Sequence, residues 1–483
     1  MHHIIAKALL GAGVLSSVLQ GVSSAAVPPR GNELANTIAV SPRGNELANT
    51  IAVSPRGDEL ANTIAVSPRD EELTVTIAVS PRDEELADTI AVSPRDEELA
   101  DTIADGHISH KTAFGHKAVL HAQQYAQHKS PTSCVKGKVF DRIVNIWFEN
   151  TDFENALADP NFKHFSEKGI LLTDYISLTH PSEPNYLASS AGDYFGLDGD
   201  PFTNLPANVS SIVDLLEDKG ITWGLYQEDM PYTGFQGMEW RNELTGADAY
   251  VRKHNPEILF ENVVDKPERL QLIKNQTLFY QDLAANTLPQ WIFFTPNMTS
   301  DAHDSSIEVA GKYLYGFLEP LLTNPHFMNN TLVVITFDEN EIYARQNRIL
   351  TILLGDVVPK ELRNTTDNTY YNHYSKISTV EANWGLHTLG RFDVGANVFK
   401  FVAEKTGDKI RSWADGVLET RFFNHSYPGF LAATVGWAPQ PVPNTKLVVN
   451  KRTVLPAIKE YWGGKDKNSK YQGQLEIPDG YNY

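Results

Sequence analysis

The sequence is short of cysteine, and its first hundred residues lack aromatic side chains altogether. Cys134 is the single cysteine among 483 residues, so no intramolecular disulfide can form. No Phe, Trp or Tyr occurs before Phe114, although the chain as a whole contains 22 Phe, 19 Tyr and 8 Trp. The remainder therefore has the aromatic content of a large core, whereas the first segment is a different kind of polymer.

Basic residues are also in deficit, and long apolar runs are missing. The formal net charge of −19 argues against nucleic acid or an anionic membrane surface as a partner. The apolar run Ala8–Val22 is too short for a membrane span, and no later run is long enough, so we expect none. Residues 1–26 are instead typical of a signal peptide, with Lys7 near the start and small residues at Ser23–Ala26. The sequence thus predicts a secreted protein, located outside the cell or in the cell wall.

A secreted chain exposes its glycosylation sequons to the modifying enzymes. Six Asn-x-Ser/Thr sequons are present, and we expect several to carry glycans. They begin at Asn208, Asn275, Asn297, Asn329, Asn364 and Asn424.

Residues 27–106 are dominated by six tandem copies of a thirteen-residue unit, which occupy 29–106. The copies contain 6 Arg against 16 Asp and Glu, so about half of the net charge lies here. Each Ser-Pro junction can start a helix, but one short helix is marginal in water. Thirteen residues is also less than the roughly 20 or more of most solenoid units. We expect solvated, partly helical low complexity and disorder rather than a packed repeat domain.

The rest of the chain divides by composition. Residues 107–137 form a polar, His-rich segment that we interpret as a linker. Residues 138–407 contain alternating strand and helix patterns that indicate one large folded domain. Residues 408–483 are aromatic and rich in proline, which indicates a strap packed over the main domain and a loose tail from Lys465 onward.

The pattern in 138–407 predicts an α/β fold. Apolar runs of strand length alternate with helix-like stretches such as Ser210–Lys219 and Ile307–Leu322. Strands that are apolar throughout indicate a doubly wound, mostly parallel sheet covered on both faces. In such sheets the chemistry collects beyond the carboxyl ends of the strands. The predicted strands lie within Val139–Phe148, Gly169–Leu172, Thr222–Tyr226, Trp291–Phe294 and Leu332–Phe337.

Polar residues follow several of these strands. Glu149-Asn150 comes after the first strand, and Asp338-Glu339 comes after the last. Hard oxygen ligands with some histidine suit a divalent cation, although they do not choose among Mg, Ca, Mn and Zn. For any single pair, an ordinary helix cap is an equally simple reading. Agreement across several strand ends favours the metal site.

The stretch Leu178–Tyr186 contains a candidate nucleophile. It consists of a turn with two prolines after an apolar run, followed by small residues suited to starting a helix. A hydroxyl at such a turn lies where backbone N–H groups and the helix dipole favour an anion. Ser182 is therefore a candidate nucleophile, and Asn185 a donor to the same anion. The alternative is that Ser182 only caps the next helix.

Six short motifs in this order resemble one enzyme family. They are Phe148–Asn150, Thr179–Tyr186, Lys253–Pro256, Thr295–Asp304, Thr336–Glu339 and Asn372–Ser375. Together they resemble the phosphoesterase family that holds fungal phosphate-repressible acid phosphatases and bacterial phospholipases C. That family in turn resembles the alkaline-phosphatase superfamily in fold. The resemblance covers roughly 138–407 and extends to about Pro441 for the fungal enzymes, but it has no counterpart of the repeats.

The resemblance implies a role for each matching residue. Ser182 is the implied nucleophile, with His303, Asp304 and His373 as further catalytic residues. Lys253 and His254, with Asn185, are the implied substrate-binding residues. The implied ligands of a divalent metal ion are Glu149, Asn150, Asp338 and Glu339. One metal ion is expected rather than two, because the dinuclear members supply more His and Asp ligands.

These expectations predict a secreted acid phosphatase that hydrolyses small phosphate monoesters through a metal-assisted phosphoserine, for phosphate scavenging. One alternative is a phospholipase C-type phosphodiesterase, which shares the motifs. An alternative of another class is a cell-wall repeat protein with an inactive phosphoesterase domain. The mechanism requires Glu149, Asn150 and Asp338 to surround Ser182, with His303 or His373 across the phosphate position. An Asp338 more than about 10 Å from Ser182 would exclude it, because one ion could not bridge them.

Overall fold

The computed structural model describes residues 49–51, 75–77, 116–242 and 246–480. The chain forms two compact units, Met1–Glu97 and Glu98–Tyr483. In the first unit, β1 (Asn49–Ile51) pairs in parallel with β2 (Val75–Ile77). These strands occupy the same positions of repeat copies two apart, so this part is extended where partial helix was predicted. The predicted signal peptide and the remaining repeat residues lie outside the described residues.

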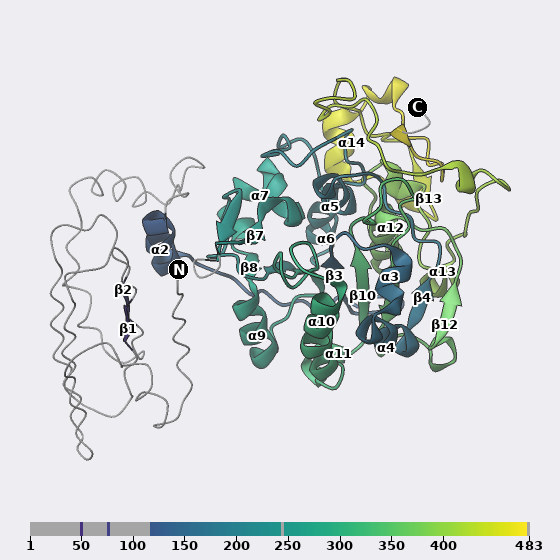
Figure 1. Cartoon of the computed structure of the whole chain (residues 1–483). Coiled ribbons are helices and arrows are strands. Elements are labelled where there is room, and N and C mark those ends of the chain that lie inside the picture. The colour runs from purple at the N-terminus through teal and green to yellow at the C-terminus, as the bar shows by residue number, and fades with distance from the viewer. Residues whose placement is uncertain (1–48, 52–74, 78–115, 243–245, 481–483) are drawn as a thin grey trace, which may run out of the picture. The chain divides into compact units, whose positions relative to one another are not determined.

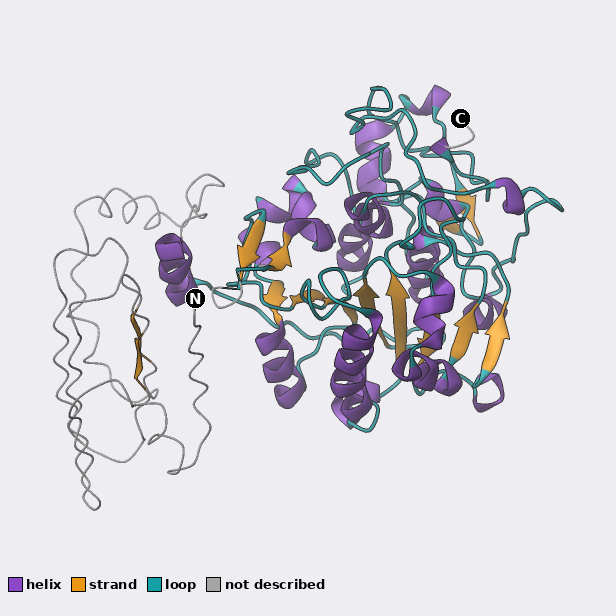
Figure 2. Ribbon diagram, in the orientation of Figure 1, coloured by secondary structure: helices purple, strands orange, loops and turns teal. Residues whose placement is uncertain are grey.

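An eight-stranded sheet crosses the second unit in the order β12-β4-β11-β10-β3-β9-β5-β8 (Figure 2). All neighbours run parallel except β11, which is antiparallel to both β10 and β4. The predicted mostly parallel sheet is confirmed. Its strands are β3 (Arg142–Phe148), β4 (Ile170–Leu172), β5 (Trp223–Gln227), β8 (Ile273–Asn275), β9 (Trp291–Thr295), β10 (Thr331–Phe337), β11 (Thr351–Leu354) and β12 (Thr365–Asp367).

Helices cover both faces of this sheet (Figure 1). Every residue of β5, β9 and β10 is buried, as expected for strands packed on two sides. None of the helices in the described ranges is both long and apolar enough to cross a membrane. The α-helices are α2 (His116–Tyr125), α3 (Phe153–Ala158), α4 (Pro160–Lys168), α5 (Ser182–Ala191), α6 (Ile212–Asp218), α7 (Glu261–Val264), α8 (Pro267–Leu270), α9 (Gln276–Ala285), α10 (Ile307–Leu321), α11 (Pro325–Met328), α12 (His373–Trp384), α13 (Lys400–Thr406) and α14 (Pro456–Trp462).

Two helices, α5 and α12, are buried along their whole length and pack against each other. The sequence of α5 explains how this is possible, because Ala188-Ser189-Ser190-Ala191 places small side chains along its second half. A left-handed residue, Gly192 with φ 72°, then ends the helix. The first residue of α5 is Ser182, so the candidate nucleophile is held by the most deeply buried layer of the molecule.

Two predicted boundaries are wrong. The segment 107–137 was interpreted as a linker, but α2 lies within it and buries Val119 and Ala122 in the core. The tail from Lys465 was expected to be loose, but Tyr471 is fully buried and Asp479 accepts a hydrogen bond from Phe422 N at 3.0 Å. Both segments are mostly polar in sequence. The few residues that they bury are widely spaced, so no apolar run indicates that the segments pack on the domain.

Candidate active site

The carboxyl ends of β3, β9 and β10 are tied together by backbone hydrogen bonds. Glu149 N, after β3, donates to Asp301 O at 3.0 Å, which lies beyond β9. Asn150 N donates to Asp338 Oδ1 at 3.3 Å, and Glu339 N donates to the same oxygen at 2.7 Å. The acidic residues that follow separate strands therefore converge at one edge of the sheet, as predicted.

Ser182 lies at this edge. Its Oγ donates to Glu149 Oε2 at 3.0 Å, and Tyr186, one turn along α5, donates its hydroxyl to Glu149 Oε1 at 2.8 Å. Burial and the charge of Glu149 raise the pKa of Asp338, and the Ser182 hydroxyl partly offsets this rise, which adds Asp338 to the groups around the hydroxyl. The N-terminus of α5 adds the partial positive charge of a helix end. Ser182 is thus brought together with Glu149 and Asp338, and the roles of these residues as nucleophile and metal ligands stay a prediction.

Three basic side chains face these acids. His254 Nε2 lies 3.0 Å from Glu149 Oε1, and its Nδ1 lies 3.5 Å from Asp301 Oδ2. Burial disfavours charge on His254, but the Glu149 and Asp301 carboxylates raise its pKa to about 9. Lys253 Nζ contacts Asp200 Oδ2 at 3.1 Å and His303 Nε2 at 3.4 Å. The site thus presents fixed positive charge beside the serine, which suits an anionic phosphoryl group.

The carboxylates have divergent pKa values. Burial opposes ionisation of Glu149, yet His254, helped by Lys253, lowers its pKa to about 2. Burial and the charge of Glu149 raise the pKa of Asp338 well above its usual range. Burial and the charge of Asp338 do the same for Glu339. Such divergence is typical of functional sites, since acids that only support the fold are normally paired.

The donor atoms of this edge fit a divalent cation. Asp338 Oδ2 and Asn150 Oδ1 are buried and have no hydrogen-bond partner among the described residues. Glu149, His254 and Asp301 are buried too, with ligand atoms within 4.8 Å of one another. Unpaired carboxylate and amide oxygens form a donor set suited to a hard cation, which would also offset the mutual repulsion of the acids.

Glu339 was expected to bind the metal ion and Asn185 to bind the substrate. In the structure the two side chains contact each other and the turn before α5. Asn185 Nδ2 donates to Glu339 Oε2 at 3.1 Å and to Thr179 O at 2.8 Å. Asn185 Oδ1 accepts from Leu178 N at 3.2 Å. The other Glu339 oxygen lies 3.2 Å from His180 Nδ1. This pair holds the turn that presents Ser182.

His373 was expected to line the phosphate pocket, and this placement is wrong. It is the first residue of the buried helix α12 and is itself fully buried. Its Nε2 lies 2.7 Å from the main-chain oxygen of Asp338, and its Nδ1 lies 3.4 Å from Lys376 Nζ. Burial, with the charge of Lys376, lowers the pKa of His373 well below its usual range. The neutral ring therefore donates from Nε2 and supports Asp338 from behind.

His303 and Asp304 remain at the open side of the site. His303 Nδ1 lies 2.9 Å from Asp304 Oδ1, which fixes the ring and turns Nε2 toward Lys253. The His303 side chain is 26% exposed, against 3% for His254. His303 is thus the histidine of this group that an entering ester meets first.

Sequence reasoning missed three residues of the site. Asp301 and Tyr186 lie within motifs that were recognised, so the neighbouring residues indicated that both lie close to the site. Asp200 gave no signal. It belongs to a loop far from any strand end, and it reaches the site by accepting from Glu183 N at 2.9 Å and contacting Lys253.

The six sequons differ in how they present the asparagine nitrogen. Asn329 and Asn364 are exposed, whereas Asn208, Asn275 and Asn297 are half-buried. Asn424 is 2% exposed, and its Nδ2 donates to the main-chain oxygens of Tyr343 and Arg345. The Asn424 amide is therefore engaged within the protein, and glycosylation of the six sequons stays a prediction.

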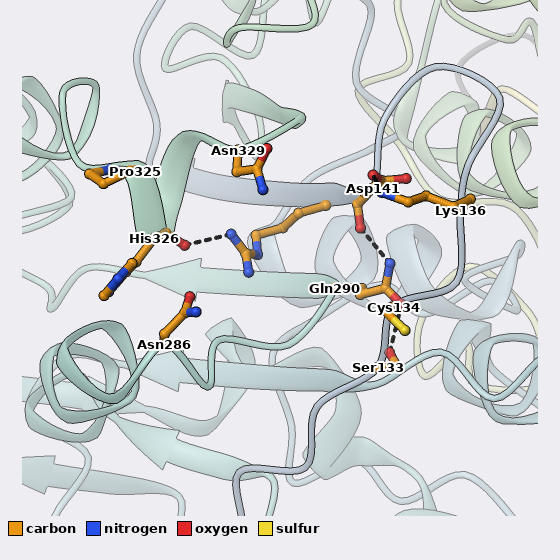
Figure 3. A pocket seen from close by; sticks show the side chains of 10 residues that line it. Ser133, Cys134, Lys136, Asp141, Asn286, Gln290, Pro325, His326 and Asn329 are labelled. Atoms are coloured by element: carbon orange, nitrogen blue, oxygen red, sulfur yellow. Dashed lines mark hydrogen bonds and ion pairs between the residues drawn. The ribbon is translucent and has the colours of Figure 1, made fainter.

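A cavity of about 300 Å³ lies at the opposite edge of the sheet, where β3 and β9 begin (Figure 3). Its charged groups are committed to structural contacts. Lys136 pairs with Asp141 at 2.6 Å, and the Arg142 guanidinium donates to main-chain oxygens, including His326 O at 2.8 Å. Cys134 also lines it. None of the residues that line the cavity has a buried side-chain nitrogen or oxygen without a hydrogen bond, in contrast to the carboxyl edge.

Comparison with known proteins gives a consistent picture. The model of the phosphoesterase family matches residues 153–387. The phosphate-repressible acid phosphatase of Penicillium chrysogenum is 50% identical over 317 residues, covering 66% of this chain and 76% of that protein. An acid phosphatase of Aspergillus fumigatus is 44% identical over 370 residues, covering 76% and 82%. A solved protein in the alkaline phosphatase superfamily from Vibrio parahaemolyticus is similar with a TM-score of 0.35 and 11% identity, covering 53% and 68%.

Proposed function

The chain belongs to the phosphoesterase family, and from this premise we propose that it is an acid phosphatase that hydrolyses phosphate monoesters through a phosphoserine at Ser182. The observation that carries the proposal is the position of Ser182 Oγ, which begins a buried helix and lies 3.0 Å from Glu149. The relatives named above as acid phosphatases support the monoester class.

The reaction divides into two displacements at phosphorus. Ser182 Oγ passes its proton to Glu149 Oε2 and attacks the phosphoryl group, the ester P–O bond breaks, and the alcohol leaves with a proton from His303. Water then attacks the phosphoserine, the serine oxygen leaves and takes its proton back from Glu149, and phosphate is released. Lys253 and protonated His254 hold the phosphoryl oxygens through both steps. His303, oriented by Asp304, gives the proton to the leaving alcohol and takes one from the attacking water.

Glu149, Asn150 and Asp338 are the residues that would hold a divalent cation, with His254 and Asp301 beside them. When bound, the cation would lower the pKa of the serine hydroxyl and neutralise charge on the phosphoryl group. Glu339 contributes indirectly, because it fixes Asn185 and His180 around the nucleophile turn.

An acid optimum follows from the proton donor. A histidine must carry its proton in order to give it to the leaving alcohol, so we expect turnover to be fastest in weakly acid solution. An extracellular enzyme of this type scavenges phosphate from varied esters, and secretion, glycosylation and a cell-wall location are part of the proposal.

A substrate comparison tests the proposed class. Purified full-length protein with added divalent cations is assayed on p-nitrophenyl phosphate and on bis(p-nitrophenyl) phosphate, and its metal content is measured. We expect a clear preference for the monoester and about one ion per chain. A preference for the diester would favour a phospholipase C-type enzyme. No turnover of any phosphate ester would favour an inactive domain.

The nucleophile is tested separately. Ser182→Ala should lower phosphate release by at least about 10³-fold, because loss of a nucleophile removes the covalent route. Acid-quenched enzyme should yield phosphoserine at Ser182 in the wild type and no label in the variant. Ser189→Ala is the matched control, since its Oγ only donates to Tyr186 O within α5 at 2.7 Å. A label on Thr179 would show that another residue is the nucleophile.

A further inference from the structure

An exposed aromatic ring stands at the rim of the proposed active site. Tyr343, in the loop after β10, is 53% exposed. Its ring stacks on the ring of His180, with centroids 3.8 Å apart and planes inclined by 24°. His180 in turn is buried and lies 3.2 Å from Glu339. The tyrosine is thus mounted on the same turn that presents Ser182.

The loop that carries Tyr343 is anchored on both sides. Before it, Asp152 Oδ1 accepts from Asn340 Nδ2 and from the backbone nitrogens of Glu341 and Ile342, at 3.0–3.1 Å. After it, Arg345 Nη1 contacts Asp152 Oδ2 at 2.8 Å. The buried amide of Asn424 donates to Tyr343 O itself. The ring is therefore held in a fixed place in spite of its exposure.

The exposed fraction increases from Ser182 through its charged neighbours and is largest at Tyr343. Ser182 is 1% exposed, and the side chains of Lys253 and Asp200 are 15% and 25% exposed. Burial, with the charges of Glu339, Asp200 and Asp338, raises the pKa of the Tyr343 phenol to about 12. The phenol is thus neutral, and its ring is linked to Glu339 through the ring of His180. An ester whose phosphoryl group reaches Ser182 from this side has its alcohol part near the ring.

We propose that Tyr343 is a specificity-determining residue that stacks against planar leaving groups of phosphate monoesters, such as an aryl ring or a nucleobase. The inference rests on the proposed function. One face of the ring is supported by His180, and more than half of the residue is open to solvent. A fixed, neutral ring of this kind offers a stacking surface with little ordering cost on binding.

The test compares variants on three esters, so that the intrinsic reactivity of each ester cancels. Wild type, Tyr343→Phe, Tyr343→Leu and Tyr343→Ala are assayed as full-length protein with divalent cation on p-nitrophenyl phosphate, adenosine 5′-monophosphate and glycerol phosphate. Stacking on an aromatic residue is worth a factor of about 5 to 100. Tyr343→Ala should lose about that factor in kcat/KM, mainly through KM, on at least one planar ester and less than about 3-fold on glycerol phosphate.

Controls separate specificity from stability. Tyr343→Phe should keep the preference for planar esters, and Tyr343→Leu should lose it. Tyr315→Ala, at an exposed tyrosine of α10, should leave the kinetics on all three esters unchanged.

The pattern of losses identifies the leaving group that the ring contacts. A loss of kcat/KM confined to p-nitrophenyl phosphate assigns the ring to small aryl groups, and a loss on the nucleotide as well assigns it to both. An equal loss on all three esters would overturn this inference alone. Absence of turnover by wild type on all of them would overturn the proposed function and this inference with it.

Discussion

Two buried aspartates near opposite ends of α5 have pKa values that are shifted in opposite directions. Asp193, just beyond the C-terminus, is fully buried and accepts from the hydroxyls of Tyr427 and Tyr471, while Lys470 Nζ lies 2.8 Å away. Burial opposes its ionisation, but Lys470 and the two hydroxyls bring its pKa below the usual value. All three partners come from the C-terminal strap. Asp193 therefore holds the fold together.

Asp338, near the N-terminus of α5, is equally buried but has no cation of its own. Its Oδ2 lacks a hydrogen bond within the described ranges, and the like charge of Glu149 adds to burial in raising its pKa. Both aspartates are buried, so burial alone does not distinguish a structural acid from a functional one. The difference lies in the groups that contact each carboxylate. An acid left unpaired at this depth is stable only with a ligand or a proton.

The largest effect is expected at Asp338, where a substitution should lower activity without lowering stability. Asp338→Asn removes one unpaired negative charge next to Glu149 and one proposed ligand. We expect kcat/KM to fall by more than about 100-fold, because even outer contacts of metal ligands are worth about 10- to 100-fold. The melting temperature without added metal should stay the same or rise, since like-charge repulsion is relieved. Both are measured on the purified variant beside wild type.

The response to added cation provides the control for this variant. Wild-type protein should gain thermal stability with divalent cation, because the ion binds the folded state. Asp338→Asn should gain clearly less. A variant that melts well below wild type without metal, yet retains its activity per folded molecule, would mean that Asp338 is a structural acid like Asp193.

The reverse outcome is expected at Asp193. Asp193→Asn leaves Lys470 without its partner, which costs about 3–5 kcal/mol in a wholly buried pair. Because the Lys470 side chain is 34% exposed, we expect a loss of about 2–3 kcal/mol in the free energy of unfolding, measured by urea denaturation. Turnover by the folded fraction should stay within about 2-fold of wild type, since Asp193 has no contact with the site.

The pH dependence of this loss has a definite sign. The folded pKa of Asp193 is lowered, so its stabilisation is present above the unfolded value of about 3.9 and is lost as pH falls through the folded value. The gap between wild type and Asp193→Asn should therefore narrow below about pH 4. Lys470→Met, which removes the partly exposed partner instead, should behave the same way. A gap that widens in acid would contradict the assignment.

The central strands and the convergence of Ser182 with Glu149 and Asp338 could be predicted, because continuous apolar runs and motifs at strand ends are local signals. The strands β8 and β12 could not, since their sequences Ile-Lys-Asn and Thr-Thr-Asp contain no apolar run, whereas the equally short β4 is apolar throughout. His373 was misplaced because a motif identifies a residue without its direction, and the burial of α12 turned the ring behind Asp338. Asp200 and Tyr343 reach the site only through tertiary contacts, so no local pattern indicates them.

A third buried acid, Glu257, sharpens the comparison because its partners carry no positive charge. Its Oε2 accepts from Ser211 Oγ at 2.8 Å, and burial raises its pKa from 4.5 to about 7 although the hydroxyls of Ser190 and Ser211 lower it. The folded state thus binds the proton more tightly than the unfolded state. The resulting stabilisation is complete below about pH 4.5 and is lost as pH rises through 7.

Glu257→Gln keeps the shape and removes this titration. Between pH 5 and 8 the variant should lose less stability than wild type, and the difference between the two slopes should reach about 1–3 kcal/mol. Urea denaturation at several pH values measures it, with the surface variant Glu460→Gln expected to follow wild type. Parallel curves for Glu257→Gln and wild type would mean that Glu257 is ionised in the folded protein. In that event a hydroxyl partner would suffice to hold a buried charge, and the unpaired state of Asp338 would no longer set the active site apart.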